Sequence, residues 1–158
     1  MQTFSQYILE QKAFTNWVKP SDADIALEYK IEYSIKPLKA QTNDAFPTLD
    51  AFKKALKAAK VITLTPAVDR QIEYRSHTRD KAGIISLIRG YASYPEFRNE
   101  KTVDAIYDGF SENKPMKYPL IIEFPNGRRR IMSGNTRVDI AIHSGVVPKA
   151  LLIKIPKE

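Results

Sequence analysis

The sequence lacks cysteine, long apolar runs and the motifs of several common enzyme classes. None of its 158 residues is cysteine, which excludes disulfides, thiolate metal sites and cysteine nucleophiles. No apolar run approaches the length that spans a bilayer, and residues 1–20 are too polar for a signal peptide. No P-loop, dinucleotide fingerprint or serine nucleophile elbow occurs. We therefore expect a soluble, cytoplasmic protein with no membrane partner.

Positive charge is in excess. The chain has 25 lysines and arginines against 18 aspartates and glutamates, a net charge of +7 and a pI near 9.5. This balance favours an anionic partner, either nucleic acid or a nucleotide. No repeat or linker interrupts the chain, so we expect a single domain over 1–158. Within it, 1–93 forms an N-terminal extension and the first part of the fold, and 94–158 forms the core.

Hydrophobic periodicity predicts a mixed order of helices and strands, and so an α+β fold. The predicted helices cover 4–18, 48–60, 80–89 and 102–112, and the predicted strands cover 27–35, 61–64, 120–124, 128–132 and 150–155. Glu28 and Lys30 share one face of the strand predicted at 27–35, a pairing that also occurs in restriction-type nucleases. Alternating charge on a wet strand face explains it equally well. The N-terminal helix could dock on the domain itself or on a protein partner.

The loop Ser133-Gly134-Asn135-Thr136-Arg137 is the strongest candidate site. It follows a predicted hairpin with the turn Pro125-Asn126-Gly127, and it leads into a short helix. A helix start has free N–H groups, a glycine allows close approach, and a guanidinium binds phosphate oxygens. The loop therefore predicts a phosphate site. The alternative is a capped helix start with Arg137 ion-paired at the surface.

The residues from about Tyr94 to Ile155 resemble the N-terminal domain of the ParB family, known as the ParB-like nuclease domain. Sulfiredoxin and a group of free-serine kinases share its fold. The helix at 102–112, the turn Asn126-Gly127 and the exit Ser144-Gly145-Val146-Val147-Pro148 follow the family's order, and 131–137 matches its hydrophobic-x-Gly-x-x-Arg pattern. The resemblance implies a ParB/sulfiredoxin-like mixed sheet flanked by helices, with an N-terminal extension of helix and strand.

The resemblance also implies phosphodiester or phosphoryl chemistry on DNA or a nucleotide. Arg137 would neutralise charge on the reacting phosphate, Gly134 would allow approach, and Ser133, Asn135 and Thr136 would orient oxygens. Mg²⁺ is the implied cofactor, with ATP or CTP as candidate nucleotides. The family's CTP-hydrolysing members carry a Gly-Glu-Arg-Arg-like loop and a downstream helix-turn-helix domain. This sequence shows neither, so we do not expect the clamp behaviour of partition proteins.

Further residues are candidates for the same chemistry. Family members bring the segment of Arg98 and Glu100 near the loop, so Arg98 is a candidate phosphate contact and Glu100 a candidate general base. Asn99 or Glu100 could instead cap the following helix. The metal ligands are unknown, and the available carboxylates are Glu100, Asp104, Glu123 and Asp139.

Two basic segments are candidate nucleic-acid contacts. On a strand, Arg128 and Arg130 share one face and Arg129 takes the other, where it could form a second phosphate clamp. Otherwise the three arginines form a solvated hairpin that contacts a nucleic-acid backbone. Arg75 belongs to a basic turn with His77 and Arg79 that could contact DNA. His77 is expected in a surface loop, and the second histidine, His143, near a helix C-terminus.

These observations leave two classes of function open. The first is an enzyme, either a ParB-like nuclease or a nucleotide-dependent phosphotransferase. The second is a non-catalytic DNA-binding or protein-binding adaptor. Thr3-Phe4 and Tyr7-Ile8 resemble the opening of myovirus-type phage proteins, which implies a phage protein in the host cytoplasm and, for the adaptor, a host-takeover or anti-defence role.

Overall fold

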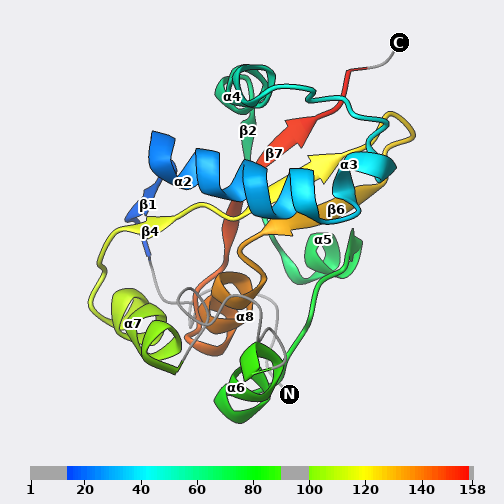
Figure 1. Cartoon of the computed structure of the whole chain (residues 1–158). Helices are drawn as coiled ribbons and strands as arrows, with labels where there is room; N and C mark the ends of the chain where they lie inside the picture. The colour runs from blue at the N-terminus through cyan, green and yellow to red at the C-terminus, as the bar shows by residue number, and fades with distance from the viewer. Residues whose placement is uncertain (1–13, 90–99, 157–158) are drawn as a thin grey trace. The chain divides into compact units, whose positions relative to one another are not determined.

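The computed structural model describes residues 14–89 and 100–156, which contain both helices and strands (Figure 1). Contacts divide the chain into two compact units, each assembled from segments that are distant in the sequence. Unit 1 comprises residues 1–17, 76–116 and 135–148, and unit 2 comprises residues 18–75, 117–134 and 149–158. The predicted α+β class is confirmed, because a mixed sheet occurs together with flanking helices.

Unit 2 contains a five-stranded mixed sheet with the strand order β2-β7-β5-β6-β3. β5 (Leu120–Glu123) is central; it runs parallel to β7 (Lys149–Lys154) and antiparallel to β6 (Arg129–Ser133). At the edges, β2 (Lys60–Thr63) is antiparallel to β7, and β3 (Ile72–Glu73) is parallel to β6. β5 and β7 are continuous apolar runs because they are buried on both faces. The strands predicted in these regions are confirmed.

The predicted hairpin turn between β5 and β6 is also confirmed. Gly127 has a φ of +87°, and its N–H donates to the carbonyl of Phe124 at 2.9 Å. Asn126 Oδ1 accepts from the backbone N–H of Arg128 at 3.0 Å. A Cβ at Gly127 would meet nothing within 4 Å, so the left-handed backbone alone requires glycine here.

Helices cover one face of this sheet. α2 (Asp22–Glu28) continues into a π-helix, η1 (Tyr29–Ile35), and the two form one rod in Figure 1. α3 (Leu38–Gln41) and α4 (Leu49–Lys57) follow. The core that they share with the sheet includes Ile25, Tyr33, Leu38, Phe46, Phe52, Leu56, Leu120, Ile122, Met132, Leu151 and Ile153.

The strand predicted at residues 27–35 is therefore wrong. Its alternation reflects residues four apart, since Ile25, Tyr29 and Tyr33 all pack in the core. Positions two apart do not face each other on a helix, so Glu28 and Lys30 do not form the nuclease-like pair that the strand would give. The apolar residues of this segment are buried on one face of a helix and not in a paired strand.

Ser21 explains why the chain enters a helix at α2. Its side chain accepts from the backbone N–H of Asp24 at 3.2 Å, and Asp24 Oδ2 accepts from the backbone N–H of Ser21 at 2.9 Å, which completes a capping box. Lys117 Nζ lies 2.6 Å from Asp24 Oδ1. Although partial burial opposes it, hydrogen bonds from Lys117 and Ser21 lower the pKa of Asp24 to about 2.

The Tyr33 hydroxyl organises the turn after α3. Tyr33 is fully buried, and its oxygen accepts from the backbone N–H of Phe46 at 2.9 Å and from Thr42 Oγ1 at 3.2 Å. It donates to Asp44 Oδ1 at 3.1 Å. One buried hydroxyl thus fixes the residues that connect α3 to α4.

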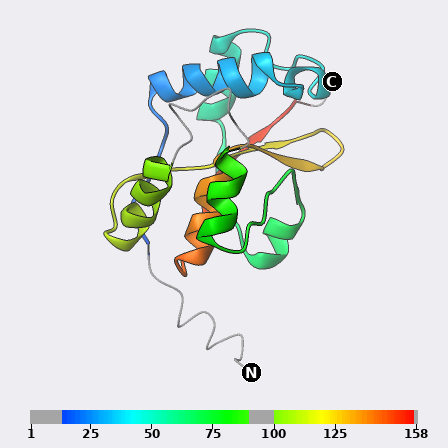
Figure 2. The same ribbon diagram turned by 60° about the horizontal axis from the view of Figure 1, so that its bottom comes forward.

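Unit 1 is helical. α6 (Lys81–Arg89) lies along α8 (Asn135–His143), and α7 (Glu100–Ser111) packs against both (Figure 2). These bounds confirm the helices predicted at 80–89 and 102–112. Phe14, Trp17 and Phe110 form an edge-to-face aromatic cluster, with ring centroids 5.0–5.5 Å apart. Lys81 Nζ lies 2.6 Å from Asp104 Oδ1 between α6 and α7.

The remaining segments are short. β1 (Trp17–Val18) and β4 (Met116–Lys117) form a two-stranded sheet, so Trp17 and Val18 do not continue the predicted N-terminal helix. Residues 14–16 of that prediction are not helical either, and residues 4–13 lie outside the described residues. α5 (Pro66–Arg70) begins after Thr65, whose Oγ1 accepts from the backbone N–H of Val68 at 3.3 Å. Among the described residues, no helix has the length and hydropathy needed to cross a membrane.

Candidate functional site

The Ser133–Arg137 loop has the local conformation that the sequence predicts. Ser133 ends β6, Gly134 has a φ of +94°, and α8 begins at Asn135. Asn135, Thr136 and Arg137 occupy the first helical turn, and each is partly exposed. The left-handed backbone at Gly134 lets the strand turn directly into the helix. The predicted order of strand, glycine and helix is thus present.

Within unit 1, α8 uses two side chains to hold residues 76–78. Asn135 Oδ1 accepts from the backbone N–H of Ser76 at 3.0 Å and lies 3.1 Å from its Oγ. Asp139 is 2% exposed, and its Oδ2 accepts from Ser76 Oγ at 2.5 Å and from Thr78 Oγ1 at 2.7 Å. The backbone N–H of Thr78 donates to the same oxygen at 3.2 Å. This carboxylate oxygen thus serves as an acceptor within the fold.

His143, the last residue of α8, also contacts the segment 76–78. Its Nε2 lies 2.6 Å from the carbonyl oxygen of Thr78, and its Nδ1 lies 3.1 Å from Tyr107 Oη. A carbonyl oxygen only accepts, so Nε2 carries the proton and a neutral ring accepts at Nδ1 from the tyrosine. Burial raises the pKa of Tyr107. His143 lies near the helix C-terminus as predicted, and the geometry gives both ring nitrogens an internal partner.

Three of the four carboxylates proposed for metal binding, Asp104, Glu123 and Asp139, have separate partners within the fold. Asp104 binds Lys81, and Glu123 lies 3.0 Å from Arg129 Nε and 3.7 Å from Lys154 Nζ. Glu100 is the first residue of α7, while Arg98 lies outside the described residues. Within residues 14–89 and 100–156, no group of three histidine, aspartate or glutamate side chains is placed to hold a metal ion.

The three consecutive arginines of unit 2 alternate about β6 as expected. Arg129 points to its cross-strand neighbour Glu123. Arg130 instead stacks on Tyr74 and donates to Gln41 Oε1. Arg128 is 67% exposed and binds Glu73 through both Nε and Nη2, at 2.8 and 2.5 Å. Two of the three guanidiniums therefore lie beside residues 73–74.

Arg75 is buried instead of presented at the surface. Its side chain has no exposed area, and its Nε donates to Asp69 Oδ1 at 2.6 Å. Its Nη2 lies 3.4 Å from Asp69 Oδ2. A contact with DNA would require Arg75 to leave this partner. Of the other residues in the predicted basic turn, His77 and Arg79 are both exposed, and His77 has a φ of +47°.

Positive charge is concentrated in unit 2. Unit 2 has seventeen lysines and arginines against ten aspartates and glutamates, whereas unit 1 has eight of each. Four of these cations lie on α4 and at the start of β2, and we call them the lysine surface: Lys53, Lys54, Lys57 and Lys60. Within the described part of the chain, none of the four ammonium groups has a hydrogen-bond or ion-pair partner. Their charge is available to an external anion.

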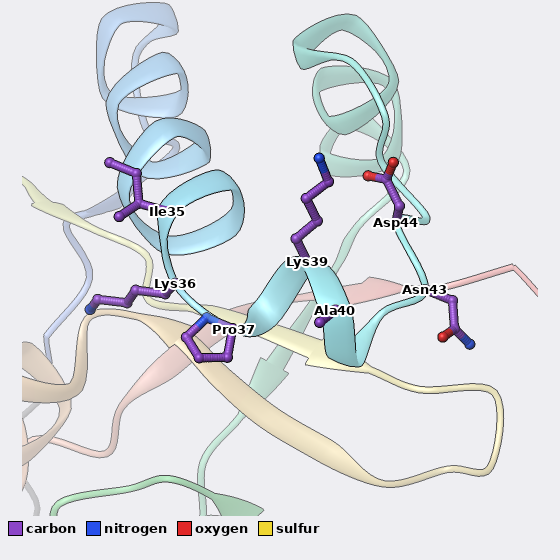
Figure 3. Close-up of a pocket in the computed structure, with 7 residues that line it drawn as sticks. All are labelled: Ile35, Lys36, Pro37, Lys39, Ala40, Asn43 and Asp44. Carbon is purple, nitrogen blue, oxygen red and sulfur yellow. The ribbon is translucent and has the colours of Figure 1, made fainter.

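Unit 2 also has an open hollow of about 490 Å³ where η1 meets α3. Its lining is largely apolar and consists of Ile35, Lys36, Pro37, Lys39, Ala40, Asn43 and Asp44 (Figure 3). In that view Lys39 rises from α3 between Ile35 and Asp44. The adjacent Asn43 and Asp44 both have a φ of +54°. Sequence reasoning missed this hollow, because it placed a strand where η1 lies.

Tyr74 was also missed. A single tyrosine in a polar segment gives no signal, and its importance depends on Arg130, which is 56 positions later.

Comparison of the chain with protein-family models, with curated proteins and with solved structures finds no match.

Proposed function

We propose that the protein binds the phosphate backbone of nucleic acid through unit 2. The observation that carries the proposal is the partition of charge, since unit 2 alone holds the net +7. A protein that neutralises phosphates with lysine and arginine releases counterions from the nucleic acid, and this release drives association. Such binding fits the anionic partner that the net charge predicts.

The lysine surface is the part of unit 2 best suited to this role. Lys53 and Lys57 are four residues apart on α4, and Lys54 and Lys57 are three apart, so the members of each pair lie on neighbouring parts of the helix surface. Lys60 begins β2, three residues after the last residue of α4. Phe52 and Leu56 on the opposite side of α4 are buried, which fixes the helix against the sheet. A backbone phosphate would gain a cation here without breaking an internal ion pair.

We expect the double variant Lys54→Glu/Lys57→Glu to bind a short duplex at least tenfold more weakly than the native protein. Each lost phosphate contact should also reduce the slope of log affinity against log salt concentration by about 0.9. Fluorescence anisotropy with a labelled duplex at several salt concentrations measures both effects.

The matched control changes the same amount of charge in unit 1. Lys101 and Lys114 are exposed there, and Lys101→Glu/Lys114→Glu should leave the affinity within about twofold of the native value. An equal loss in both double variants would mean that net charge, and not the lysine surface, determines binding. No binding of the duplex or of a single strand at about 50 mM salt by the native protein would refute nucleic-acid binding altogether.

The Ser133–Arg137 loop is a second candidate, for a nucleotide or for phosphoryl chemistry of the ParB-like kind. It is favoured by the left-handed backbone at Gly134 and by the position of Arg137 in the first turn of α8. If Arg137 neutralises charge on a reacting phosphate, Arg137→Ala should lower turnover about a hundredfold while the fold survives. Release of phosphate from ATP or CTP and nicking of short DNA, each with and without Mg²⁺, measure turnover.

The control for this experiment is Lys101→Ala, which removes an exposed cation of the same unit. It should leave turnover unchanged. Absence of turnover with all three substrates, in the native protein as in the variants, would favour the non-catalytic adaptor. If DNA binding in that case falls steeply with salt, the remaining function is DNA binding without catalysis.

A further inference from the structure

Tyr74 presents an aromatic ring at the surface of unit 2. It directly follows β3, and it is 61% exposed. The guanidinium carbon of Arg130 lies 3.9 Å from the centroid of its ring. This cation–π contact occupies one face of the ring. Tyr74 is 61% exposed although Arg130 lies over its ring, so much of the side chain remains accessible to solvent.

The backbone holds Tyr74 in a conformation that bulky residues rarely adopt. Its φ is +66°, in the left-handed region. The neighbours on both sides are anchored, because Ile72 is 4% exposed in β3 and the Arg75 side chain is buried against Asp69. Such strain persists only where the surrounding structure fixes it, and it is concentrated at binding and switch sites.

The cations around the ring are also held in place. Arg130 extends from β6 between Tyr74 and Gln41, which accepts from its Nη1. Arg128 is 67% exposed and is oriented by two contacts with Glu73, the residue before Tyr74. The hydrogen bond from this exposed guanidinium lowers the pKa of Glu73. The ring and the two guanidiniums form a fixed, net positive surface.

We propose that Tyr74, supported by Arg130, is a stacking platform for an unpaired base, so that the nucleic acid bound by this protein is single-stranded. This inference rests on the proposed function. Bases in a duplex are already stacked, whereas an unpaired base can place its π-face on an aromatic ring whatever its identity. Arg128 is then positioned for the phosphate next to the stacked base.

Three ligands of equal length separate base stacking from charge: oligo-dT, an abasic phosphodiester strand and a duplex. We expect oligo-dT to bind about tenfold more tightly than the abasic strand, which has the same phosphates but no bases. The variant Tyr74→Asn should remove this advantage, because asparagine tolerates the left-handed backbone but offers no ring. Its salt slope should stay that of the native protein, since no phosphate contact is lost. Tyr74→Trp should retain the advantage.

Equal affinity of the native protein for oligo-dT and the abasic strand would overturn the platform. If the affinity for both strands still fell steeply with salt, the proposed function would remain supported. The platform would also be overturned if Tyr74→Asn weakened all three ligands equally, with circular dichroism confirming an intact fold. Failure of the native protein to bind any of the three would overturn both the platform and the proposed function.

Discussion

Replacing Asp69 with alanine is expected to lower the free energy of unfolding by about 3–5 kcal/mol. The carboxylate of Asp69 and the guanidinium of Arg75 are both buried, with side-chain exposures of 7% and 0%. The variant would keep the arginine inside the protein without the carboxylate that faces it, and a buried charge without its partner is costly. Urea unfolding followed by tryptophan fluorescence and by circular dichroism measures the change.

A double variant separates the charge from the packing. In Asp69→Leu/Arg75→Met both charges are replaced by apolar groups, and the stability should lie much closer to that of the native protein. The exposed Asp50 provides the control, since Asp50→Ala should cost at most about 1 kcal/mol. A loss below 1 kcal/mol for Asp69→Ala would contradict the expected cost of leaving Arg75 without this carboxylate.

The same double variant tests Arg75 as a ligand of nucleic acid. If its role is to anchor the chain after β3, the salt slope of nucleic-acid binding should not change in Asp69→Leu/Arg75→Met. A slope reduced by about 0.9 would instead assign Arg75 a phosphate contact. The sequence could not make this distinction, because a buried arginine and an exposed one look alike in a basic turn.

The segment 22–35 shows why a clear sequence pattern misled. Alternation with a period of two also contains a period of four, and residues four apart lie on one face of a helix. Ile25, Tyr29 and Tyr33 fit that spacing and are in the core, whereas Ile35 is 58% exposed. The i→i+5 hydrogen bonds of a π-helix are rare enough that no propensity rule would favour them. The capping box at Ser21 was the available helix signal.

The elements from Thr48 to Lys57 and from Leu120 to His143 were predictable for local reasons. Thr48 caps α4 by accepting from the backbone N–H of Ala51 at 3.1 Å, and Asn126-Gly127 supplies the turn of the β5–β6 hairpin. Each of these signals depends on neighbours in the sequence.

The partners of α8 were not predictable in the same way. Asn135 and Ser76 are 59 positions apart, and only the tertiary structure brings them together. Sequence reasoning therefore found the glycine and the arginine of the loop. It missed that Asn135 and Asp139 use acceptor oxygens to hold residues 76–78.

Replacing Asp139 with alanine is expected to cost about 3–4 kcal/mol, since three donors lose one shared acceptor. Those donors are the hydroxyls of Ser76 and Thr78 and the backbone N–H of Thr78, and Asp139 is 2% exposed. Asp139→Asn keeps one oxygen acceptor and should lose about half as much. Chemical unfolding gives the free energy, and amide hydrogen exchange should be faster at Thr78.

Asp108 of α7 is the matched control for Asp139, because it is an exposed aspartate on a helix of the same unit. Asp108→Ala should stay within about 0.5 kcal/mol of the native protein. A loss for Asp139→Ala below 1 kcal/mol, with unchanged exchange at Thr78, would show that this carboxylate does not hold residues 76–78. Asp139 would then be available again as a metal ligand or general base beside the Gly134 loop. A large loss of stability with nucleic-acid affinity retained below the unfolding transition would instead assign Asp139 to the fold.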